Sequence, residues 1–318
     1  MDNRSNVTYI TFGGYVEVHK YRYLYFVIMF TVYMLIISSN VTIVCIIIIH
    51  KNLHEPMFIF IAALLINSVL FSTVIYPKLL IDFLSEKQII SYPACLFQWF
   101  LYYWLGSSDF FLLSIMAYDR YVSICNPLKY TTIMQKTTVN LFLFSAWILP
   151  ACQVSVAILL SAKREICKFH LKGILCNSTV QTLHCVRSRI LNIYGLVNLV
   201  NVLILPVLFI LFTYSRIIVV SYRCRGVRRR AAQTCLPHLL VLINFSCFTA
   251  YDVLLSRLEL DSSKIVSLIM ALQVVIYHPL FNPIIYGLKI GRIYDHLKTL
   301  FSRLKSIIRI LHHFLVTF

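Results

Sequence analysis

Seven apolar segments, each long enough to cross a bilayer, constrain this chain more than any other feature of its sequence. They fall at roughly 25–49, 57–83, 95–121, 138–160, 193–220, 234–257 and 264–287. A helix needs about 20 apolar residues to span about 30 Å of hydrocarbon. Because backbone polar groups in lipid need internal partners, such segments form helices. We therefore expect an all-α membrane protein, a seven-transmembrane helix bundle.

The composition argues against a soluble domain. Hydrophobic residues make up 59% of the 318 residues and charged residues only 13%, whereas soluble domains carry about 25% charged residues. The net charge is +17, but no basic domain stands apart from the apolar segments. Phospholipid headgroups and a cytoplasmic protein are therefore better partners than nucleic acid.

The end of the chain has a different pattern. After Gly287, apolar residues recur at helical spacing and polar residues occupy the other face, which indicates a short amphipathic helix lying on the inner leaflet. The chain then divides into an N-terminal segment (1–24), a seven-span domain (25–287) and an amphipathic helix with a tail (288–318).

Two signals predict the orientation. A cluster of arginines lies in the short segment after the fifth span, where positive charge indicates the cytoplasm. N-glycosylation sequons begin at Asn3, Asn6 and Asn177, all on the opposite side. We expect a multi-pass protein of the plasma membrane with an extracellular N-terminus and a cytoplasmic C-terminus. Its first span serves as the insertion signal.

Charged residues mark the inner end of the third span. Asp119 and Arg120 lie where this helix should end, and Asn126-Pro127 follows as a helix stop. Charges at membrane depth cost roughly 2.5–3.5 kcal/mol each, so they indicate function. The alternative is a pair of charges that snorkel to the membrane boundary. Midway along the same span, Asp109 needs internal partners for the same reason.

Four cysteines lie on the side predicted to be extracellular, where disulfides persist. Cys95 opens the third span, and Cys167, Cys176 and Cys185 lie in the long loop at about 161–192. The sequence alone allows several pairings. A metal site formed with His170 or His184 is the alternative, but ligand pairs at zinc spacing are absent.

The residues do not suggest catalysis. Histidines lack a neighbouring nucleophile and acid, and there is no phosphate-binding glycine loop. We expect no enzyme and no cofactor. A transporter or channel is the alternative class, but inverted repeats and lining rings are not evident.

Several motifs, in order, resemble those of odorant receptors, a branch of the rhodopsin-like G-protein-coupled receptors. The resemblance extends from about residue 40 to 289. The motifs are LHEPMF (53–58), MAYDRYVSIC (116–125), YSRII (214–218), RAAQTCLPHL (230–239) and PLFNPIIY (279–286). Polar residues interrupt the third, sixth and seventh segments, so their assignment as membrane spans rests partly on this resemblance. The tryptophan-and-proline toggle of most rhodopsin-like receptors is missing from 245–248, as in odorant receptors.

The resemblance implies a receptor that binds a small-molecule odorant from outside and activates a heterotrimeric G protein, the stimulatory olfactory type that raises cyclic AMP. A rhodopsin-like receptor for another small ligand is the alternative. The residues implied in G-protein coupling are Asp119, Arg120, Tyr121, Tyr214, His238, Asn282, Pro283 and Tyr286. At rest Arg120 pairs with Asp119, and in the active state it reaches Tyr214 and Tyr286. Arg228 to Arg230 offer no acid to hold Arg120, which predicts constitutive activity.

By position along the helices, an aromatic and hydroxyl lining suits a small ligand. These candidate ligand-binding residues are Tyr102, Tyr103, Gly106, Ser107, Asn198, Val202, Thr249, Val253 and Leu272.

The resemblance also implies two disulfides, Cys95–Cys176 and Cys167–Cys185. An asparagine, Asn40, is expected to tie the first span to the second and seventh.

A buried polar cluster is also implied. Ser68 stands where rhodopsin-like receptors carry a buried aspartate, which departs from their conventional sodium site. With Asn67 and Asn282, Asp109 and Ser68 could hold sodium or a proton, or form an inert hydrogen-bonded network.

Overall fold

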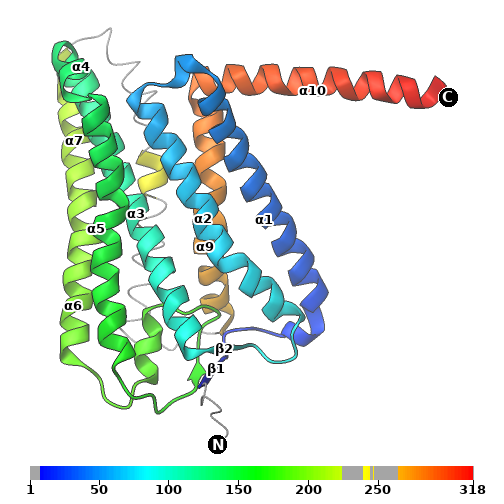
Figure 1. Ribbon diagram of the computed structural model, residues 1–318, viewed down its shortest axis with the longest axis vertical. Coiled ribbons are helices and arrows are strands. Elements are labelled where there is room, and N and C mark those ends of the chain that lie inside the picture. Colours follow the sequence, from blue (N-terminus) through cyan, green and yellow to red (C-terminus); the bar gives the residue numbers. More distant parts are fainter. Residues whose placement is uncertain (1–7, 224–238, 244–245, 247–263, 318) are drawn as a thin grey trace, which may run out of the picture.

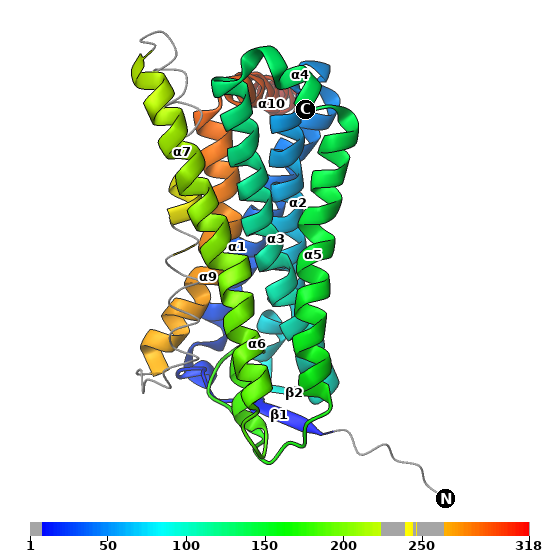
Figure 2. The same cartoon turned by 90° about the vertical axis from the view of Figure 1, so that its left-hand side faces the viewer.

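The computed structural model describes residues 8–223, 239–243, 246 and 264–317. Five long helices run along a common axis (Figure 1): α1 (Val18–Ile49), α2 (Pro56–Leu84), α3 (Tyr92–Cys125), α5 (Lys136–Ala162) and α9 (Lys264–Lys289). The fifth expected span is α6 (Arg189–Leu199), η4 (Val200–Ile204) and α7 (Leu205–Arg223), which follow one another along the bundle (Figure 2). Of the sixth span, 239–243 and 246 are described, and they are helical.

Length and composition qualify five helical stretches of the described residues as membrane spans: α1, α2, α3, α5 and the continuous stretch Arg189–Val220. Proline determines several ends. Pro56 begins α2, where a missing N–H costs nothing. Asn126-Pro127 ends α3, as expected, and is followed by η2 (Pro127–Lys129) and α4 (Tyr130–Ile133). The helix α1 begins at Val18, earlier than the expected residue 25.

The fifth span contains a π-helical turn. The turn η4 (Val200–Ile204) ends two residues before Pro206. Proline has no N–H, and its ring clashes with the carbonyl four residues earlier, here that of Val202. A wider π turn accommodates the interruption without ending the helix.

A small β-sheet covers the end of the bundle where the described chain begins, and the sequence did not predict it. Its order is β2 (Ile89–Ser91), β1 (Tyr9–Phe12), β3 (His170–Leu171), with β1 antiparallel to β2 and parallel to β3. Glycine is favoured at position 14, because a Cβ there would lie 2.7 Å from the backbone carbonyl carbon of Gly173, which cannot turn aside as a side chain can. The second outer loop also contains η3 (Ser178–Leu183).

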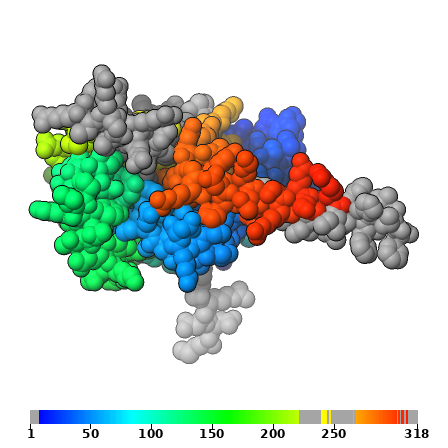
Figure 3. Space-filling model, turned by 90° about the horizontal axis from the view of Figure 1, so that it is seen from above, coloured from blue at the N-terminus to red at the C-terminus, as the bar shows by residue number. Residues whose placement is uncertain are grey.

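The helix α10 (Gly291–Thr317) leaves the other end of the bundle sideways (Figures 1 and 3). It has 27 residues and is therefore not the short helix that was expected. Ile293 is buried, and Arg292 pairs with Glu55 at 2.5 Å. A Cβ at Gly287 would lie 3.2 Å from Leu297 and 3.3 Å from Ile43, so this glycine of α9 lets α10 and α1 both pack closely against α9.

Candidate functional site

The predicted charge pair at the inner end of α3 is present and buried. Nε of Arg120 donates to Oδ2 of Asp119 at 3.0 Å, and Nη2 of Arg120 also bonds to this oxygen. Asp119 is fully buried and Arg120 is 9% exposed. The two side chains therefore do not snorkel into water.

Tyr130 is a third member of this group, which the sequence reasoning missed. Its hydroxyl donates to Oδ1 of Asp119 at 2.8 Å from α4, in the second inner loop. Burial and the negative charge of Asp119 raise the pKa of the Tyr130 phenol. The sequence feature that could have predicted this contact is a tyrosine just beyond Pro127, where α3 ends. Both oxygens of the carboxylate are thus occupied, one by a cation and one by a neutral donor.

Other residues of the coupling set lie nearby. Tyr214 on α7 and Tyr286 on α9 are buried in one hydrophobic cluster with Met116 and Ala117 of α3, and Tyr121 packs against this cluster. Pro283 lies inside α9. His238 falls outside the described residues.

A polar cluster occupies the middle of the bundle, and all its hydrogen bonds are buried or partly buried. Nδ2 of Asn67 donates to Oδ1 of Asp109 at 2.9 Å, and Nδ2 of Asn282 donates to Oγ of Ser68 at 3.0 Å. These bonds join α2, α3 and α9, as the predicted cluster requires.

Two further side chains complete this cluster, and neither was predicted. Nε1 of Trp147 on α5 donates to Oδ1 of Asn67 at 3.0 Å. Nε2 of His278 on α9 lies 3.6 Å from Oδ2 of Asp109. His278 stands one helical turn before Asn282, so both face the same interior.

The candidate ligand residues are only partly brought together. Tyr102, Tyr103 and Leu272 belong to one hydrophobic cluster in the outer half of the bundle. Tyr103 also donates to Oγ of Ser178 in the second outer loop at 3.0 Å. Val202, in contrast, packs against the inner cluster.

The remaining candidates differ in exposure. Ser107 is buried, and Asn198 is half-buried. A Cβ at Gly106 would meet no atom of the described residues within 4 Å, so among these residues space is open beside α3 at this level. Thr249 and Val253 lie outside the described residues.

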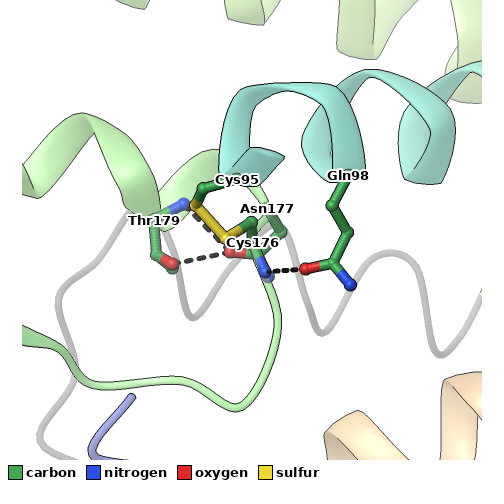
Figure 4. The surroundings of a disulfide bond; sticks show 5 residues. All are labelled: Cys95, Gln98, Cys176, Asn177 and Thr179. Atoms are coloured by element: carbon green, nitrogen blue, oxygen red, sulfur yellow. Dashed lines mark hydrogen bonds between the residues drawn. A yellow bond between two sulfur atoms is a disulfide. The ribbon is translucent and has the colours of Figure 1, made fainter. Parts of the chain in front are cut away.

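Both implied disulfides are present, Cys95–Cys176 and Cys167–Cys185. The first joins the second outer loop to the start of α3, and Oε1 of Gln98 accepts from the N–H of Cys176 at 3.1 Å (Figure 4). The second closes the loop on itself. With all four cysteines engaged, the alternative metal site made from them is wrong.

Of the three predicted glycosylation sites, only Asn177 is described. Its Oδ1 accepts from the N–H of Thr179 at 3.0 Å and from its hydroxyl at 2.6 Å, so this asparagine caps η3 (Figure 4). Asn3 and Asn6 lie outside the described residues.

Comparisons with known proteins agree with this architecture. A sequence model of the family described as "Olfactory receptor" matches residues 29–304. Human olfactory receptor 11A1 is 30% identical over 92% of this chain and 93% of its own length. Human olfactory receptor 10K1 is 31% identical over 90% of this chain and 92% of its own. The crystal structure of squid rhodopsin shares the fold, with a TM-score of 0.74 at 16% identity, covering 92% of this chain and 83% of that one.

Proposed function

The chain belongs to the olfactory receptor family, and on that premise we propose that it binds a small odorant within its bundle and activates a heterotrimeric G protein. It is a signalling receptor of the multi-pass plasma-membrane type, not an enzyme. The G protein is the stimulatory olfactory type, so the signal is a rise in cyclic AMP.

The proposal rests on one observation: the guanidinium of Arg120 is buried and paired with a carboxylate at the cytoplasmic end of the bundle. Arg120 is bound by Asp119, and Tyr130 fixes that carboxylate from the loop. A buried ion pair is weak evidence for stability, and breaking it by removing one partner costs several kcal/mol. Such a pair suits a two-state switch, in which releasing Arg120 exchanges one set of contacts for another.

In the active state we expect Arg120 to leave Asp119 and to reach Tyr214 and Tyr286. Both tyrosines already lie in the hydrophobic cluster at the inner half of α3. A phenol can accept a bond from the guanidinium, so the exchange does not leave the charge without a partner. A cleft then opens for a helix of the G protein.

The ligand is expected in the outer half of the bundle. Tyr102 and Leu272 supply apolar and aromatic surface, and Ser107 supplies a hydroxyl. A ligand shifts the switch only as far as its affinity differs between the two states. The open space beside Gly106 lies between the outer aromatic residues and the polar cluster at Asp109 along α3.

The decisive experiment is a panel of odorants applied to cells that express the full chain, with cyclic AMP as the readout. Arg120→Ala should abolish the response. Arg292→Ala is a matched control, because this inner arginine is exposed and pairs with exposed Glu55; it should respond like the wild type at equal surface expression. A response that survives Arg120→Ala would contradict the mechanism.

The orientation is tested separately. We expect enzymatic deglycosylation to shift the mobility of the wild-type chain, and Asn3→Gln with Asn6→Gln to remove most of that shift. An antibody should reach an N-terminal epitope on intact cells and a C-terminal epitope only after permeabilisation. The reverse staining would refute the predicted topology.

A further inference from the structure

The buried acid of the central cluster has a histidine as its neighbour. Asp109 is 1% exposed and His278 is 5% exposed. A carboxylate at this depth is strongly unfavourable unless a positive or proton-donating group compensates for it. The resemblance to rhodopsin-like receptors implies a sodium ion as one such group, and a side chain of the bundle is the other.

The imidazole of His278 is placed to be that compensating group, at ion-pair distance from the carboxylate. Nε2 of His278 faces Oδ2 of Asp109 at 3.6 Å, and the other oxygen accepts from Asn67. One proton makes the pair neutral as a whole, whether it resides on the imidazole or on the carboxyl group. Adding a metal cation to that neutral pair would leave an uncompensated positive charge in the interior of the bundle.

With the imidazole in place, the oxygen atoms of the cluster offer little to a hard cation. Such ions take about six oxygen ligands, and nitrogen donors here are directed at the oxygens. Oγ of Ser68 accepts from the amide of Asn282 and donates to the carbonyl of Leu64. Among the oxygen atoms of the described part of the cluster, Oδ1 of Asn282 has no hydrogen-bond partner. With Ser68 in place of an aspartate, Asp109 is the carboxylate of the described cluster, and its Oδ2 faces the imidazole rather than a cation.

We infer that His278 takes the place of a sodium ion in this receptor. The cluster is an internally neutralised hydrogen-bonded network, in which the imidazole is the counterpart of Asp109. This goes beyond the proposed odorant function and does not depend on it. Two consequences follow: the folded chain is insensitive to sodium, and the sensitivity appears when the imidazole is removed.

The test uses the purified full-length chain in detergent. Its melting temperature is measured from 0 to about 300 mM NaCl, with choline chloride holding the ionic strength constant. We expect no difference between the two salts for the wild type. His278→Ala should be less stable in choline and should gain a saturable, sodium-specific rise in melting temperature of about 3 °C or more.

Two variants keep the test specific. Asp109→Asn combined with His278→Ala should lose the sodium response, because the carboxylate that would bind the ion is gone. His296→Ala removes a histidine on α10, outside the cluster, and should behave like the wild type in both salts. If His278→Ala does not fold, His278→Asn, which has no cationic form, replaces it in the same experiment.

Two results would overturn the inference. One is sodium stabilisation of the wild type that disappears in Asp109→Asn, since this would place an ion beside the histidine. The other is a folded His278 variant with no sodium response, since the imidazole would then not be what takes the ion's place. Because the readout is melting temperature, neither depends on knowing the odorant.

Discussion

The side chain of Asn40 donates a hydrogen bond of 2.9 Å from Nδ2 to the carbonyl oxygen of Pro279. This carbonyl is four residues before Pro283, which has no N–H to offer it. Asn40 also bonds to the carbonyl of Ile36 in its own helix. The first span therefore supplies the donor that the proline removes from the seventh, as expected for prolines inside membrane spans.

Replacing Asn40 with alanine should destabilise the receptor. The carbonyl of Pro279 would be left buried without its side-chain donor, which costs about 1–3 kcal/mol. We expect a melting temperature several degrees below that of the wild type in detergent. Ser38→Ala is the control, because the Ser38 hydroxyl bonds only within α1, to the carbonyl of Leu35, among the bonds described. Equal melting temperatures for the two variants would contradict the role of Asn40.

Removing the Tyr130 hydroxyl should raise basal signalling. Tyr130→Phe deletes the bond to Oδ1 of Asp119, and bonds to charged groups contribute about 1.5–3 kcal/mol. Because the resting pair is weakened, we expect basal cyclic AMP to rise several-fold at equal surface expression. Tyr118→Phe is the matched control, since its ring packs against Phe142 and the ring is retained. Basal activity unchanged by Tyr130→Phe would refute the idea that Tyr130 holds the resting state.

Loss of either disulfide should reduce the amount of folded receptor at the surface. Removing a native disulfide typically costs about 2–5 kcal/mol. We expect Cys95→Ser and Cys176→Ser to have equal effects, and their combination to be no worse than either one. Cys152→Ser, at an exposed free cysteine, should express normally. Flow cytometry of a surface epitope measures this, and a double variant much worse than each single one would argue against the pairing.

Filling the open space beside α3 should weaken ligand potency without affecting folding. We expect Gly106→Val to raise the half-maximal odorant concentration at least about tenfold, equivalent to about 1.4 kcal/mol. Gly291→Ala is the control, since a Cβ there also meets nothing within 4 Å but lies at the inner end of the bundle. Unchanged potency in Gly106→Val would move the ligand site elsewhere.

Acidification should destabilise the second outer loop. Burial, with the nearby charge of Arg164, lowers the pKa of His184, which is 7% exposed. As the pH falls, His184 therefore becomes protonated in the unfolded chain before it does so in the folded chain. The free energy of unfolding decreases as the pH drops below the ordinary histidine pKa of about 6.5. We expect the melting temperature to fall between pH 7.5 and 5.5, and to fall less in His184→Asn. The control is His19→Asn, at an exposed position; its melting temperature should fall as far as that of the wild type.

Apolar length predicted the helices well, because in lipid the chain has few alternatives to a helix. The start of α1 was missed since residues 18–24 mix tyrosine with charged side chains and carry little hydropathy signal. The extent of α10 was missed for a similar reason, because an amphipathic pattern indicates a face but not where the helix ends.

The sequence predicted the ion pair between neighbouring residues, but it did not predict contacts between side chains from distant segments. Asp119 and Arg120 are neighbours, but Tyr130 reaches them only after the chain turns at Pro127. His278 meets Asp109 across two helices that are separated by more than half of the chain. Its role depends on the rotation of α9 about its own axis, which the sequence pattern alone does not specify.

The sheet at the outer end has a consequence for how the receptor is handled. Because β1 occupies the middle of the order β2-β1-β3, the amino-terminal strand acts as a clasp between two loops that lie far apart in the chain. Truncation past Phe12 would leave both loop strands with bare edges. Reporter tags for this receptor therefore belong ahead of residue 8, and shortened amino termini should alter how quickly odorants enter and leave.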